Sequence, residues 1–124
     1  MSWLLVALGG AGGAMARHGV GIMALRLMGP GFPWGTLAVN IFGSLLMGLL
    51  VGLLARVSGL PIELQRLLAT GFLGAFTTFS TFALDAVTLY ERGHVGLAAV
   101  YVLASAIGAL AGCFLGLWIM KSTS

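Results

Sequence analysis

One twelve-residue segment holds many of the side chains in this sequence that could act on an ion. Residues 71–82 read GFLGAFTTFSTF and contain two glycines, four hydroxyl side chains and four phenylalanines. Glycine and β-branched threonine lower helix stability, and hydroxyl groups compete with the helix for backbone hydrogen bonds. The segment therefore allows two interpretations, a helix that breaks here and a continuous helix whose threonines bond to the preceding turn.

A break inside a membrane would free backbone carbonyls and amides that lipid cannot satisfy. Such a break is tolerated inside protein or around an ion, and carbonyl oxygens are hard ligands that suit Na⁺ in transporters with discontinuous helices. Phe79 and Phe82 are three residues apart and share a helical face. Because the edge of an aromatic ring is electropositive, edge-on phenylalanines could solvate a small anion without trapping it.

Two other segments carry polar or small side chains at helical spacing, each set on one helix face. In residues 34–55 the set is Thr36, Asn40, Gly43, Ser44 and Gly48. In residues 95–120 it is Tyr101, Ser105, Gly108 and Gly112. Asn40 is then either an interhelical hydrogen-bonding group or a donor on a transport pathway. The hydroxyl of Ser105 either relays along a groove or bonds to the carbonyl four residues earlier.

Arg17 and Asp85 are the only formal charges deep within apolar sequence, and both are costly in a bilayer unless they face protein or water. Arg17 has no acid nearby in its own helix, which suggests an anion-attracting vestibule or a pair across helices. Asp85 is expected to pair with an arginine or to shape a pathway. His18 has no second histidine or acid at ligand spacing, so an interfacial position is favoured over a metal site.

Four helices are needed to position these residues. About 20 apolar residues in a helix cross the roughly 30 Å hydrocarbon core. Turn signals divide the chain into four such pieces: residues 3–28, 34–55, 62–90 with the candidate break near 74–78, and 95–120. The sequence therefore predicts an all-α integral membrane protein, with one four-helix membrane domain over residues 1–124.

Composition supports this class. The chain has 124 residues, of which 60% are hydrophobic and 7% are charged, and its mean hydropathy is +1.10. A soluble domain carries roughly 25% charged residues. These values exclude a soluble enzyme and a nucleic-acid-binding domain, and the single Cys113 excludes a secreted disulfide scaffold.

The basic residues leave the orientation in the membrane open. Four spans place both chain ends on one side, with Arg56, Arg66 and Lys121, whereas the other side has Arg26 and Arg92. This near balance allows either a single orientation or insertion in both orientations with antiparallel pairing.

Oligomer formation is expected because four short helices cannot easily enclose an ion path and also keep every polar group away from lipid. Three GxxxG-type segments, at residues 9–13, 48–52 and 108–116, offer faces for close approach. They either pack helices within one chain or support a homo-oligomer, and their number favours the homo-oligomer.

The sequence resembles the Fluc (CrcB) family of fluoride-specific ion channels at three places. These are residues 9–17 (GGAGGAMAR), residues 35–43 (GTLAVNIFG) and residues 71–82, in which TTFSTF is the most specific motif. The resemblance covers three of the four spans by motif. It implies a passive channel that exports toxic cytoplasmic fluoride across the cell (inner or plasma) membrane. It also implies a dual-topology, antiparallel homodimer with two pores.

The resemblance further implies a structural Na⁺ that is not transported. The backbone carbonyls of Gly74 and Thr77 from both subunits would hold this ion at the dimer centre. Asn40 would be the pore amide, and Phe79 and Phe82 would be the aromatic pair along the anion path.

More loosely, the resemblance places Tyr101 and Ser105 on a polar track of the fluoride pathway in the last helix. Arg17 would lie at a vestibule entrance and Asp85 near a pore mouth. The chemistry of these residues agrees, because fluoride is small and strongly hydrated. Amides, hydroxyls and ring edges donate to it with a moderate strength that allows the ion to leave.

Three other functions are weighed against this one. A small four-helix proton-coupled multidrug-type exporter is similarly short, but it needs a carboxylate in the first helix, where this chain has Arg17. A structural subunit would conduct nothing when pure. Intramembrane catalysis is disfavoured because Ser80 and Asp85 lie five residues apart, off a common helix face. The sequence therefore predicts a protein that is not an enzyme.

Overall fold

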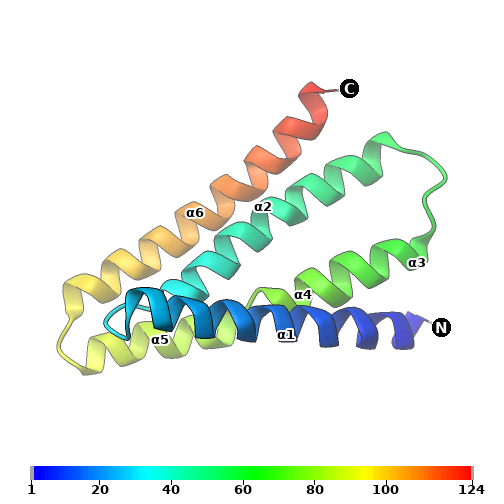
Figure 1. Cartoon of the computed structure of the whole chain (residues 1–124). Coiled ribbons are helices and arrows are strands. Elements are labelled where there is room, and N and C mark those ends of the chain that lie inside the picture. Colours follow the sequence, from blue (N-terminus) through cyan, green and yellow to red (C-terminus); the bar gives the residue numbers. More distant parts are fainter. Residues whose placement is uncertain (1, 124) are drawn as a thin grey trace.

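The computed structural model describes residues 2–123, and every regular element in this range is a helix (Figure 1). The elements in chain order are α1 (Ser2–Met28), α2 (Trp34–Arg56), α3 (Ile62–Gln65), the π-helical segment η1 (Arg66–Leu73), α4 (Gly74–Phe76), α5 (Phe79–Glu91) and α6 (Val95–Ser122). The all-α class predicted from the sequence is confirmed.

Proline and glycine explain where the helices begin and end. Pro33 directly precedes α2 and Pro61 directly precedes α3. Proline suits the start of a helix because its missing N–H would have no intrahelical partner there. Gly29, Gly59 and Gly93 turn the chain in three loops with φ of 77°, 87° and 86°. Glycine adopts this left-handed backbone without a steric penalty.

Three helical stretches are long and apolar enough to cross a membrane: Trp34–Arg56, Ile62–Glu91 and Val95–Ser122. Helix α1 has 27 residues but contains Arg17, and it is not among these stretches. Large apolar side chains such as Trp3, Phe114 and Trp118 are exposed on the outside of the chain. This surface suits lipid, so the chain is a multi-pass membrane protein.

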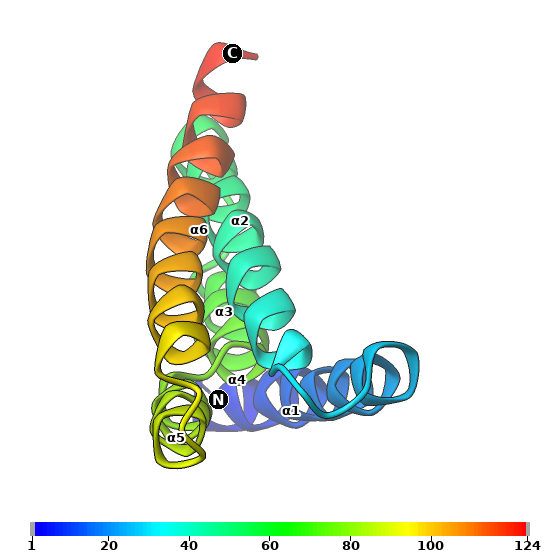
Figure 2. The same ribbon diagram turned by 90° about the vertical axis from the view of Figure 1, so that its left-hand side faces the viewer.

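Two helix pairs build the fold. Helices α2 and α6 run side by side over most of their length (Figures 1 and 2). Helix α1 packs along η1 and α4, and α5 packs against α6. Figure 2 shows the C-terminal half of α1 extending away from the α2–α6 pair. The link between α4 and α5 therefore lies where both helix pairs meet.

The GxxxG segments pack helices within this one chain. A Cβ added at Gly13 of α1 would collide with the carbonyl oxygen of Phe72 in η1. A Cβ added at Gly48 of α2 would collide with the carbonyl oxygen of Cys113 in α6. A Cβ added at Gly116 of α6 would likewise collide with the backbone of α2, at the carbonyl oxygen of Leu45. The interpretation that these motifs act within one chain is confirmed, so they give no support to the expected homo-oligomer.

Candidate functional site

The segment that the sequence singled out is interrupted between α4 and α5. Helix α4 ends at Phe76 and α5 begins at Phe79. Thr77 (φ −86°, ψ 159°) and Thr78 (φ −152°, ψ 127°) between them have extended backbone. These two residues separate the continuous helical stretch of α3, η1 and α4 from α5.

At the interruption, side chains take over backbone donors. In a continuous α-helix the Thr78 N–H would bond to the carbonyl of Gly74, and the Thr81 N–H would bond to that of Thr77. Here the Thr78 N–H donates to Asn40 Oδ1 at 2.7 Å. The Thr81 N–H donates to Thr78 Oγ1 at 3.3 Å, so Thr78 caps the N-terminus of α5. Both helical donors are therefore directed away from the carbonyls of Gly74 and Thr77.

Other carbonyls around the interruption receive hydrogen bonds from the protein. Leu73 O accepts from the N–H and from Oγ1 of Thr77, at 3.1 and 3.0 Å. Thr78 O accepts from Asn40 Nδ2 at 2.9 Å. The backward bond of Thr77 and the interruption therefore occur together, although the sequence presented them as alternatives.

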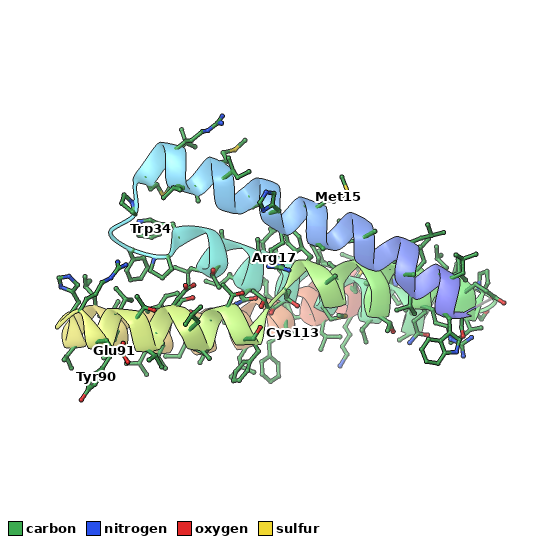
Figure 3. All side chains as sticks on the ribbon, turned by 90° about the horizontal axis from the view of Figure 1, so that it is seen from below. Met15, Arg17, Trp34, Tyr90, Glu91 and Cys113 are labelled. Atoms are coloured by element: carbon green, nitrogen blue, oxygen red, sulfur yellow. The ribbon has the colours of Figure 1, made fainter. Side chains whose placement is uncertain are left out.

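Arg17 supplies one of these hydrogen bonds from α1. Its Nε donates to Ala75 O at 3.0 Å. Figure 3 shows Arg17 pointing from α1 toward the interruption, whereas Met15 points away from the protein. The guanidinium lies at the C-terminal end of the helix that finishes with α4, where the helix dipole favours a positive charge. Arg17 thus binds a backbone carbonyl across helices.

A groove of about 330 Å³ opens beside the interruption. Its lining contains an amide, four hydroxyls, two aromatic rings and three aliphatic side chains: Asn40, Ser44, Thr77, Thr78, Phe79, Phe82, Ser105, Ala106, Ala109 and Leu110. The fold thus brings five of the predicted site residues together from α2, α5, α6 and the α4–α5 link.

The aromatic pair stands at this groove. The ring centroids of Phe79 and Phe82 lie 5.6 Å apart with their planes tilted by 45°. Phe82 is half-buried and contacts the ring of Tyr101 at 5.3 Å. Phe79 is 81% exposed in the single chain. Contacts with the core therefore hold the ring of Phe82, whereas most of the Phe79 side chain is left uncovered by its own chain.

Ser105 also lines this groove, and its hydroxyl is buried. Its residue is 5% exposed, and within the described chain its Oγ has no hydrogen-bond partner. The interpretation that Ser105 bonds to the carbonyl four residues earlier is therefore wrong. An unsatisfied buried hydroxyl costs about 1–3 kcal/mol. A group that accepts a hydrogen bond from this hydroxyl would offset the cost.

Tyr101 and Asp85 form a pair away from this groove. The buried Tyr101 donates from its hydroxyl to Asp85 Oδ2 at 3.2 Å. Within the described residues Asp85 forms no ion pair with an arginine, so of its two expected roles the arginine pair is wrong and the role in shaping a pathway stays a prediction. Asp85 lines a separate pocket of about 320 Å³, together with Thr36, Thr88 and Arg92.

A third hollow shares lining residues with each of the other two. This groove of about 280 Å³ contains Arg17 and His18. It shares Thr36 with the Asp85 pocket and Thr78 with the groove beside the interruption. The sequence did not single out Thr36 and Thr78 as site residues, although both stood in the recognised polar segments. His18 is exposed, and the described residues contain no group of three or more His, Cys, Asp or Glu that could hold a metal ion.

Comparison with known proteins identifies the family. The model of the CrcB-like protein family (Camphor Resistance) matches residues 4–117. The fluoride-specific ion channel FluC of Agrobacterium fabrum is 58% identical over 113 residues, which cover 91% of this chain and 90% of that protein. FluC of Rhizobium etli is 52% identical over 119 residues (96% and 95%), and FluC of Rhodopseudomonas palustris 49% over 122 residues (98% of each). This chain, with its interrupted helix and lined groove, therefore belongs to the CrcB-like family.

Proposed function

We propose that this chain forms a passive, fluoride-selective ion channel. The relatives named above are fluoride-specific ion channels, a class of protein that is not enzymatic. The observation in this chain that best supports the proposal is the groove at the interruption. It combines the amide of Asn40, the ring pair of Phe79 and Phe82, and the unpaired buried hydroxyl of Ser105.

These groups suit a small anion. The Asn40 amide has two N–H donors, of which one bonds to Thr78 O, so the second is available to the groove that Asn40 lines. Ser105 offers an O–H, and the rings of Phe79 and Phe82 offer electropositive edges. Among the described residues, those that line this groove carry no charged side chain. Neutral donors replace hydration water yet let the ion leave, as conduction requires.

Arg17 and the Tyr101–Asp85 pair serve the pathway from outside the groove. Arg17 places a positive charge in the neighbouring hollow, where it attracts anions toward Thr78. Tyr101 does not line the groove, so its role is to support the ring of Phe82 and to hold Asp85. Asp85 then stands in a pocket that shares Thr36 with the hollow of Arg17, which fits a pore mouth.

The carbonyls of Gly74 and Thr77 fit a structural Na⁺. They are neutral hard oxygens, and the donors that a continuous helix would give them bond elsewhere. A bound Na⁺ would satisfy these carbonyls and stabilise the interruption, without being transported. One chain supplies two such oxygens, so a second chain would complete the coordination.

A homodimer fits the same observations. Phe79 is 81% exposed in the single chain although it lines the groove, and a second copy of the chain would cover it. The near-balanced basic residues allow the two copies to insert antiparallel in the cell (inner or plasma) membrane. In that arrangement fluoride leaves the cytoplasm down its gradient, aided by the negative interior. The multidrug-type exporter is not favoured, because α1 carries Arg17 and the relatives are channels.

Release of fluoride from liposomes tests the function directly. Purified protein is reconstituted in KF-loaded vesicles with Na⁺ present, and external fluoride is followed with an ion-selective electrode. Rapid fluoride release is expected, with negligible chloride release from a KCl-loaded control. If well-incorporated protein releases neither anion, the channel proposal is contradicted, and a structural subunit becomes the favoured function.

A further inference from the structure

The interruption leaves some carbonyls without their helical donors, whereas others receive hydrogen bonds from the protein. On one side of Gly74, the carbonyl of Leu73 accepts from Thr77, and on the other side that of Ala75 accepts from Arg17. Next to Thr77, the carbonyl of Thr78 accepts from Asn40. Simple fraying would release the carbonyls of a helix end together. Here the protein satisfies the carbonyls of Leu73, Ala75 and Thr78, and side chains divert the donors of Gly74 and Thr77. The carbonyl of Phe76 also accepts no hydrogen bond from the described residues, but no side chain takes its donor.

Two side chains divert these donors. Asn40 Oδ1 takes the Thr78 N–H that would otherwise bond to Gly74 O, at 2.7 Å. Thr78 Oγ1 takes the Thr81 N–H that would otherwise bond to Thr77 O, at 3.3 Å. Asn40 also donates to Thr78 O at 2.9 Å, so its amide pairs with the backbone of Thr78 on both sides. This pairing holds Thr78 in the extended conformation that keeps α4 and α5 apart.

We propose that Asn40 and Thr78 are positioning residues that keep the carbonyls of Gly74 and Thr77 available to a cation. This inference rests on the proposed Na⁺ site and adds the groups that keep it open. Without Asn40 Oδ1, the Thr78 N–H returns to Gly74 O and the helix extends through the interruption. Without Thr78 Oγ1, the Thr81 N–H turns back toward Thr77 O. Either change removes a cation ligand although no ligand atom is mutated.

Asn40 also links the cation carbonyls to the groove. One N–H and Oδ1 of its amide are held by Thr78, and this fixes the plane in which the second N–H points. A cation that stabilises the interruption therefore also fixes the donor in the groove. Because such coupling is reciprocal, an anion held by Asn40 favours cation binding.

The test reads Na⁺ binding through protein stability and needs no fluoride. The full-length protein is unfolded by heat in lipid nanodiscs while Na⁺ replaces choline at constant ionic strength. The midpoint of Na⁺ binding, which equals its Kd, is fitted from the stabilisation, because the stabilisation grows as RT ln(1 + c/Kd), where c is the Na⁺ concentration. The variants are Asn40→Leu, Thr78→Val, which is close in shape but lacks the hydroxyl, and Thr78→Ser, which retains it. A chain that fails to conduct still gives this midpoint, so failure of the channel function is distinguished from failure of the inference.

The midpoint is expected to rise at least about tenfold in Asn40→Leu and Thr78→Val, the factor that corresponds to about 1.4 kcal/mol of binding. Thr78→Ser should stay near the unmodified chain. A wild-type midpoint in Thr78→Val, equal shifts in Thr78→Val and Thr78→Ser, or no Na⁺ effect on the unmodified chain would each overturn the proposal. If Asn40→Leu does not fold, the comparison of Thr78→Val with Thr78→Ser alone decides whether the proposal holds.

Discussion

Arg17 on α1 donates through Nε to the carbonyl oxygen of Ala75, 58 residues later in the chain and at the end of α4. The guanidinium of Arg17 thus satisfies the carbonyl of Ala75, which the end of α4 leaves without a helical partner. It also opposes the partial negative charge at the helix C-terminus. Arg17 is therefore part of the structure of the interruption as well as a source of positive potential beside it.

Removal of this contact should lower stability. Arg17→Gln is expected to cost about 1–3 kcal/mol, because a carbonyl near the interruption loses its charged donor. The measurement is the thermal unfolding midpoint in nanodiscs. Arg26→Gln is the matched control, since Arg26 lies on the exposed last turn of α1 and surface changes usually stay within about 0.5 kcal/mol. Equal losses in both variants would show that the Ala75 contact contributes nothing.

The two phenylalanines of the groove should respond differently to substitution. Phe79→Ile and Phe82→Ile both remove a ring edge and should reduce fluoride flux at least about tenfold, or about 1.4 kcal/mol in the barrier. Phe82→Ile should also lower stability, because Phe82 contacts Tyr101, whereas Phe79 is exposed in the single chain. Phe114→Ile provides a control on the exposed face of α6. Unchanged flux in both groove variants would remove the role of ring edges.

The sequence was sufficient to predict the all-helical class and the segment that carries the site. Hydropathy predicts the membrane-crossing helices because the bilayer thickness sets the length of an apolar stretch. The prolines before α2 and α3 mark where these helices begin, because proline geometry acts on neighbouring residues. The weak helix formers of residues 71–82 allow either an interruption or a continuous helix, and the fold contains the interruption, at Thr77 and Thr78. Such features depend on residues close together in the chain.

Partners of polar groups could not be predicted from the sequence. Asn40 and Thr78 are 38 residues apart, and spacing within one helix contains no information on which backbone a neighbouring helix presents. The charge of Asp85 suggests an arginine partner or a pathway role but does not indicate Tyr101, which the fold brings to it. The GxxxG motifs showed that helices approach closely, but whether the approaching helix belongs to the same chain depends on topology.

Glycines of these motifs should be intolerant of a methyl group. Gly13→Ala should destabilise the single chain by more than about 1 kcal/mol, because its Cβ would collide with the carbonyl oxygen of Phe72. Gly19→Ala, on the same helix with nothing within 4 Å of its Cβ, should be neutral or stabilising by up to about 1 kcal/mol. Unfolding midpoints measure both. Similar stabilities for the two variants would contradict the close packing of α1 on η1.

Substitution of Ser105 separates an effect on fluoride conduction from an effect on protein stability. Ser105→Ala removes a buried hydroxyl that has no partner in the described chain, so the free energy of unfolding should stay the same or rise by up to about 3 kcal/mol. If the hydroxyl donates to fluoride in the groove, the same variant should lose conduction, with flux reduced at least about tenfold. Ser105→Thr, which keeps the hydroxyl, should retain more flux than Ser105→Ala. Liposome flux and thermal unfolding measure the two effects separately. A fall in stability together with unchanged flux would mean that Ser105 only fills space between α5 and α6.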